Sequence, residues 1–177
     1  ELQTENLSDL TAFVFQDVFL LEDTLLENIR MGTDATEEQV RQAAKAAQID
    51  DFIMSLPKGY ATRIGDEGVK LSGGQQQRIS IARAILKDAP IVVFDEATSY
   101  SDIENEHKIQ LALQNLLRGK TTIMIAHRLS TIRNADKIFV FQDGKVVEQG
   151  THDELIASGS TYSHMWDTYT RETIGEE

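Results

Sequence analysis

The sequence predicts an α/β domain with a mainly parallel sheet. Residues 91–94 (IVVF) and 121–126 (TTIMIA) are apolar runs typical of buried strands, and residues 11–15 (TAFVF) form a similar run earlier in the chain. Helical patterns separate these runs, one extending from residue 72 to about residue 86 and another ending at Gly119. Strands that alternate with helices are typical of a parallel sheet.

The stretch from about residue 22 to residue 70 is expected to be helical and to form a subdomain inserted after the first strand. A helical turn is expected at residues 25–31. A capping box of Thr36 and Gln39 predicts a helix start, and four residues share the apolar face of that helix: Val40, Ala43, Ala44 and Ala47. A further short helix is expected at residues 50–56, stopped by Pro57.

The C-terminal part contains a hairpin signal and a second capping box. Asp143-Gly144 separates two apolar segments at residues 137–141 and 145–149, which predicts a tight turn between antiparallel strands. Thr151 and Glu154 then predict the start of a helix.

Composition and charge exclude several classes of function. The 177 residues carry a formal net charge of -12, which argues against binding to nucleic acid or to an anionic lipid surface through a broad basic patch. It does not argue against ATP, because local groups hold nucleotide phosphates. The chain has no cysteine, so disulfides and thiolate metal sites are excluded. Its apolar runs are too short to span a bilayer.

Polar residues follow each of the three predicted strands. Gln16 follows the first, Asp95 and Glu96 end the second, and His127 follows the third. If the strands are neighbours, these side chains converge beyond one edge of the sheet, where parallel sheets bind ligands. Together they indicate metal-assisted hydrolysis: Asp95 holds Mg²⁺, Glu96 acts on the attacking water, and the other two contact the terminal phosphate, the metal or the water.

A serine followed by two glycines, at residues 72–74, precedes the helix that runs to about residue 86. Glycines let a phosphate approach the backbone, and the N–H groups of a helix N-terminus favour an anion. Ser72 can add a hydroxyl donor to Gly73 and Gly74. The alternative interpretation is a glycine turn with a serine cap, but the longer string LSGGQQQR is far more specific.

Five segments, in this order, resemble the motifs of ABC ATPases. They are FVFQD with Gln16 (Q-loop), LSGGQ (signature), IVVFDE with Asp95 and Glu96 (Walker B), SYSD with Asp102 (D-loop) and IAHRLST with His127 (switch loop). The resemblance implies a P-loop NTPase-like core, with ATP and Mg²⁺ as cofactors. It further implies that nucleotide is contacted by Leu71, Ser72, Gly73, Gly74, Gln75 and Asp102.

The segments TRIGDEGVKLSGGQ (residues 62–75) and GTHDELIASGSTY (residues 150–162) resemble exporter-type members. The resemblance implies ATP-driven export by a head-to-tail dimer of ATPase domains, attached to a transmembrane domain on the cytoplasmic side of the membrane. It also implies a helical subdomain at about residues 22–88, with residues 1–21 and 89–177 forming the remainder of the ATPase core.

A phosphate-binding P-loop of the pattern Gly-x4-Gly-Lys-Ser/Thr does not occur in the sequence. The nearest match, Gly119-Lys120-Thr121, joins a helix to a strand, whereas a P-loop joins a strand to a helix. We therefore expect that the N-terminal part of the parent domain is missing and that these residues alone are inactive, with weak ATP binding. Exposed apolar surface and self-association are also expected.

Two other functions remain open at this point. ABC-type ATPases also act in DNA repair and in translation, although the chain shows neither a coiled-coil insertion nor a second ATPase cassette. The chain could also be a non-catalytic module that lends its signature loop to the ATP site of a partner.

Overall fold

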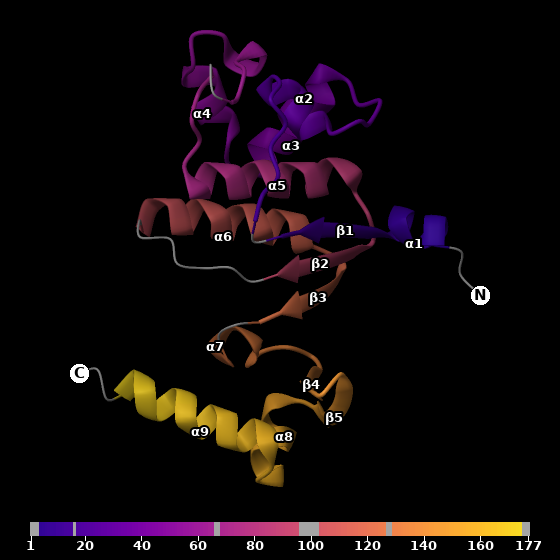
Figure 1. Ribbon diagram of the computed structural model, residues 1–177, viewed down its shortest axis with the longest axis vertical. Helices are drawn as coiled ribbons and strands as arrows, with labels where there is room; N and C mark the ends of the chain where they lie inside the picture. Colours follow the sequence, from indigo (N-terminus) through magenta and orange to yellow (C-terminus); the bar gives the residue numbers. More distant parts are fainter. Residues whose placement is uncertain (1–3, 16, 66–67, 96–102, 127–128, 175–177) are drawn as a thin grey trace. The chain divides into compact units, whose positions relative to one another are not determined.

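The computed structural model describes residues 4–15, 17–65, 68–95, 103–126 and 129–174 (Figure 1). The chain forms two compact units, Glu1–Ile125 and Ala126–Glu177. The predicted boundaries of a helical subdomain at 22–88 do not coincide with this division and stay a prediction.

A parallel sheet forms the centre of the first unit. Its strands are β1 (Thr11–Val14), β2 (Ile91–Asp95) and β3 (Thr121–Ile125), in the order β1-β2-β3 among the described residues. Both strand pairs are parallel, and Phe94 lies opposite Val14 on one side and Met124 on the other. The predicted α/β architecture with a parallel sheet is thereby confirmed.

Helices fill the rest of the first unit. They are α1 (Thr4–Leu10), α2 (Leu25–Arg30), α3 (Glu37–Ala46), α4 (Asp50–Ser55), the 3-10 turn η1 (Gly59–Ala61), α5 (Gly73–Lys87) and α6 (Ile103–Leu117). Between β1 and β2, all the regular elements of the described residues are helical, as the sequence predicted. The capping box of Thr36 and Gln39 is present at the start of α3.

One apolar core joins the helices to one face of the sheet. The predicted face of α3 is buried, with Val40 and Ala44 fully inaccessible to solvent. Ile79 and Ala82 of α5 are equally buried, and they belong to the same core as Val14 and residues of β2 and α6. In Figure 1, α5 and α6 lie side by side next to the sheet, and their close packing is also seen in the contacts between them.

The expectation that residues 121–126 form a buried strand is wrong in one respect. The strand exists, but all five residues of β3 are exposed, and Ile123 and Ile125 retain 53% and 52% of their accessible surface. β3 lies at an edge of the described sheet, and the helices cover β1 and β2 on one face. The apolar run at residues 121–126 therefore predicted the strand correctly, but not its burial by other elements of the described chain.

The second unit is built on an antiparallel hairpin. Strands β4 (Ile138–Gln142) and β5 (Lys145–Gly150) are joined by Asp143 and Gly144, whose positive φ angles of 50° and 74° fit the predicted tight turn. Helices α7 (Leu129–Ile132), α8 (His152–Ser158) and α9 (Thr161–Ile174) complete the unit. The predicted capping box of Thr151 and Glu154 starts α8.

The described helices include none with the length and apolar character needed to cross a membrane.

Candidate functional site

The carboxyl ends of the three parallel strands meet at one edge of the sheet. β1 ends at Val14, β2 at Asp95 and β3 at Ile125; Val14 pairs in register with Phe94, and Asp95 pairs with Ile125. Three loops therefore start at the same edge of the sheet, and Gln16, Glu96 and His127 lie one or two residues after the strand ends. Those three residues, and Asp102, lie outside the described residues, so the convergence of their side chains stays a prediction.

Asp95 lies at this edge on the face of the sheet opposite the helices. Val92 and Phe94 are buried in the core, so the alternation of a strand directs Val93 and Asp95 to the other face. The neighbour of Asp95 in register is the exposed Ile125. Asp95 is partly exposed, and it lies beside an apolar surface; its role as a metal ligand stays a prediction.

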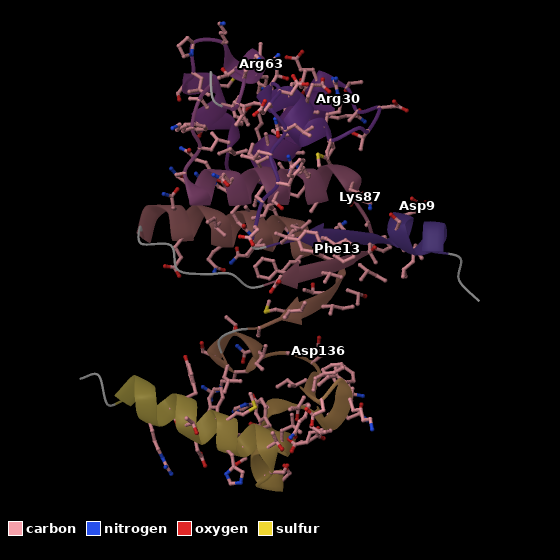
Figure 2. All side chains as sticks on the ribbon, in the orientation of Figure 1. Asp9, Phe13, Arg30, Arg63, Lys87 and Asp136 are labelled. Carbon is pink, nitrogen blue, oxygen red and sulfur yellow. The ribbon has the colours of Figure 1, made fainter. Side chains whose placement is uncertain are left out.

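The apolar surface around Asp95 is open to solvent in the described part of the chain. Phe13 and Phe15 stack on each other with ring centroids 5.4 Å apart, and they are 47% and 56% exposed. Phe13 is labelled on β1 in Figure 2. Phe13 pairs in register with Val93 and thereby with the exposed Ile123. The prediction of exposed apolar surface is confirmed, and self-association stays a prediction.

The signature segment forms the N-terminus of α5 through a reciprocal capping box. The backbone N–H of Gln75 donates to the Ser72 hydroxyl oxygen at 3.3 Å, and the backbone N–H of Ser72 donates to Oε1 of Gln75 at 2.9 Å. Ser72 is exposed, and its hydroxyl hydrogen is still available to a ligand because the oxygen acts as the acceptor. The serine-cap interpretation is therefore correct locally, and it is compatible with anion binding.

The two signature glycines differ in their surroundings. A Cβ added to Gly73 would meet nothing within 4 Å, whereas one added to Gly74 would lie 3.1 Å from Cγ of Asn105 on α6. Gly74 is buried and Gly73 is exposed. Gly74 thus allows α5 and α6 to pack closely, and Leu71 packs against the core, so the described structure gives both a packing role beside the predicted nucleotide contact.

Arg83 is a residue of α5 that the sequence analysis did not identify. Its guanidinium donates to the carbonyl oxygens of Asn28 (2.6 Å) and Phe19 (2.7 Å) and to Oδ1 of Asn28 (3.1 Å). Burial lowers the pKa of Arg83 from its ordinary value. A signal was present in the sequence, because Arg83 lies four residues after Ile79 on the apolar face of the helix, where a charged residue is unusual.

The exporter-like segment is hydrogen-bonded to the chain that precedes α2. The N–H of Ile64 donates to the carbonyl of Asp23, and the N–H of Leu25 donates to the carbonyl of Thr62, each at 2.9 Å. Gly68 packs so tightly on the carbonyl of Arg63 that a Cβ there would lie 2.3 Å from its oxygen. Thr62 and Ile64 are therefore hydrogen-bonded to Leu25, the first residue of α2, and to Asp23.

Comparison with known proteins identifies the family of the chain. The family model for the ABC transporter matches residues 2–99. An ATP-dependent lipid A-core flippase of Legionella pneumophila (strain Paris) is 52% identical over 178 residues, which cover 100% of this chain and 30% of that protein. A Bacillus subtilis (strain 168) protein named for multidrug export, as an ATP-binding/permease protein, is 52% identical over 94% of this chain and 29% of its own length.

A solved structure of a bacterial Atm1-family ABC exporter with ATP bound is also similar. It superposes with a TM-score of 0.79 at 44% sequence identity, over 93% of this chain and 29% of that chain. The chain therefore spans about 30% of the length of these relatives. It belongs to the ABC transporter family, and it corresponds to the nucleotide-binding domain of an exporter.

Proposed function

We propose that the chain is the part of an ABC exporter that binds and hydrolyses ATP to power transport across a membrane. The observation that carries the proposal is the common edge at which β1, β2 and β3 end, one or two residues before Gln16, Glu96 and His127. The similarity to exporters over nearly the whole chain supports the same conclusion.

Each residue at this edge has a chemical role in the proposal. The partly exposed carboxylate of Asp95 has the oxygen donors that suit Mg²⁺, and Gln16 would add an amide oxygen. Bound there, Mg²⁺ would neutralise charge on the phosphates of ATP. Glu96 would orient and deprotonate the attacking water, and His127 would contact the terminal phosphate.

A second ATPase domain would complete the site. Ser72 and Gly73 are exposed at the N-terminus of α5, a helix of 15 residues whose dipole favours an anion. We propose that they contact the terminal phosphate of ATP held by the partner domain in a head-to-tail dimer, with the backbone of Gly74, Leu71, Gln75 and Asp102 assisting.

A transmembrane domain is the other proposed partner. One relative is named as an ATP-binding/permease protein and another as a flippase, and both are far longer than this chain. We propose that residues 22–88 form the helical subdomain that faces the membrane domain, on the cytoplasmic side of the membrane.

Replacing the proposed water-activating carboxylate tests the function directly. We expect Glu96→Gln in the full-length protein to reduce ATP turnover by about a hundredfold or more, while ATP binding is retained. Turnover is measured by phosphate release and binding by nucleotide titration. Asp88→Asn, on the exposed C-cap of α5, is the matched control and should leave turnover unchanged. Substantial hydrolysis by Glu96→Gln would refute the role of Glu96.

The 177 residues alone are expected to bind ATP weakly or not at all. Backbone N–H groups and the lysine of a P-loop supply much of the affinity for phosphates, and the sequence contains no such pattern. Isothermal titration with ATP and Mg²⁺ would measure this, and micromolar affinity would contradict the expectation.

A further inference from the structure

The segment at residues 17–24 connects the end of β1 to the start of α2, and it has no helix or strand apart from a single bridge at Thr24. It directly follows Gln16, so its position decides how the chain leaves the edge of the sheet. Side chains from outside the segment bind its backbone: Asn28 from α2 and Arg83 from α5 bind residues 19–24, and Arg63 donates to the carbonyl of Glu22 at 2.9 Å.

Asn28 is inaccessible to solvent, and its side-chain amide binds the backbone of the segment. Its amide group donates to the carbonyl oxygen of Leu21 at 3.0 Å, and its Oδ1 accepts from the N–H of Leu21 at 2.8 Å. The amide also donates to the carbonyl of Thr24 at 3.0 Å. The Asn28 amide thus bonds both the N–H and the carbonyl oxygen of Leu21, and the N–H of Asp23 donates to the same carbonyl at 2.7 Å.

Arg83 joins the same segment to the signature helix. One nitrogen donates to the carbonyl of Phe19 at 2.7 Å, and two others donate to the backbone and side-chain oxygens of Asn28. Arg83 lies 11 residues after Ser72 on the same uninterrupted helix, about 16 Å along its axis at the usual rise. A helix of this length is stiff, so a displacement at its N-terminus is transmitted to Arg83.

We propose that Arg83 is a positioning residue that makes the segment after Gln16 move together with the signature helix α5, acting through Asn28 and the carbonyl of Phe19. The inference deepens the proposed function and rests on it. A partner's nucleotide that binds at Ser72 would shift α5, and the guanidinium would pull residues 19–21, and with them the exit of the chain at Gln16. Contact of Ser72 with the partner's nucleotide would thereby change the position of the chain after Gln16 in the ATP site of the same domain.

The chemistry of the contact favours arginine at this position. A guanidinium presents several N–H donors in a fixed plane, so one side chain can bind Phe19 and Asn28 simultaneously. An ammonium group in the same place would reach fewer of these oxygens with a fixed geometry. Arg83→Lys therefore separates the geometry of the contact from its charge.

Two measurements on the full-length protein test the proposal. We expect Arg83→Met to speed hydrogen exchange at the Leu21 amide by about tenfold, because the partner of that amide, Asn28, loses its support. We also expect kcat for ATP hydrolysis to fall by about tenfold to a hundredfold at nearly unchanged KM, since positioning is lost while nucleotide contacts are kept. Arg83→Lys should lie between Arg83→Met and the unaltered protein in both measurements.

Arg30→Met is the matched control. Arg30 also donates to a backbone carbonyl, that of Ala35 at 2.9 Å, but it does not bridge α5 and the segment at residues 17–24. We expect it to leave kcat and Leu21 exchange unchanged. If Arg83→Met does not fold, as judged by circular dichroism, Arg83→Lys alone decides the outcome.

The failures of the two proposals can be distinguished. Unchanged exchange at Leu21 and unchanged kcat in the folded Arg83 variants would overturn the positioning role, as would a loss of kcat in the Arg30→Met control equal to that in Arg83→Met. If the unaltered full-length protein hydrolyses no ATP, the proposed function fails, and the positioning role that rests on it is overturned as well.

Discussion

The helical part of the first unit and the open face of its sheet differ in how their side chains are partnered. Around α2 and α5, the buried Asn28 and the half-buried Arg83 each donate more than one hydrogen bond to backbone carbonyl groups. On the open face of the sheet, Phe13, Ile123 and Ile125 are about half exposed, and no described element covers them. Arg30 and Arg63 mark the helical part in Figure 2, and Phe13 marks the sheet.

The comparison teaches that a segment without helix or strand can be held by more tertiary contacts than a regular strand. Residues 17–24 and 62–65 are irregular, yet hydrogen bonds connect them to α2, to α5 and to each other. β3 is a regular strand, but its side chains have no apolar cover within the described residues. The helical part is thus complete in itself, whereas the sheet presents a surface suited to further contacts.

The largest expected effect contrasts two isoleucines, one in each region. Ile79 is fully buried and Ile123 is 53% exposed. Ile79→Ala should lower the free energy of unfolding by about 2 to 5 kcal/mol, because it leaves a cavity. Ile123→Ala should change it by less than about 0.5 kcal/mol. Urea unfolding followed by circular dichroism measures both, and equal losses would show that the open face is covered in solution.

An intermediate effect is expected at the buried tyrosine of the helical part. The hydroxyl of Tyr60 donates to Oδ1 of Asp50 at 2.7 Å, and Arg41 lies 3.4 Å from the same oxygen. Tyr60→Phe leaves the Asp50 carboxylate without this donor and should cost about 1 to 3 kcal/mol in unfolding free energy.

The Tyr60 contact also has a pH dependence with a definite sign. Burial, and secondly the hydrogen bond to Asp50, raise the pKa of Tyr60 well above its ordinary value. Its contribution to stability is therefore fully present below pH of about 10 and is lost as the pH rises further, since the unfolded chain releases the proton first. The stability difference between the unaltered protein and Tyr60→Phe should shrink above that pH, and a constant difference would contradict the assignment.

The smallest expected effect on stability compares two identical caps. Ser72 and Thr36 each form a capping box with a glutamine three residues later. Ser72→Ala and Thr36→Ala should each cost about 1 kcal/mol in unfolding free energy. Ser72→Ala should also reduce ATP turnover in the full-length protein, whereas Thr36→Ala should not. Equal ATP turnover in the two variants would show that Ser72 acts only as a helix cap.

Local chemistry allowed several elements to be predicted with accuracy. The capping boxes at Thr36 and Thr151 and the Asp143-Gly144 turn depend on neighbouring residues, so a short stretch of sequence contains all the information needed. Gly119, with a positive φ of 71°, ends α6 before β3 begins, which confirms that Gly119-Lys120-Thr121 is no P-loop. The predicted burial of residues 121–126 failed because cover depends on elements distant in sequence.

By itself, the sequence determined the order of strands and helices, the motifs and the helix caps, since each is set by residues a few positions apart. Only the tertiary structure decided that Gly74 packs on Asn105 and that Arg83 and Asn28 support the chain after Gln16. Gly74 and Asn105 are 31 positions apart, and Arg83 lies 64 positions from Phe19 and 55 from Asn28. No local pattern specifies which distant backbone oxygen a half-buried guanidinium will meet.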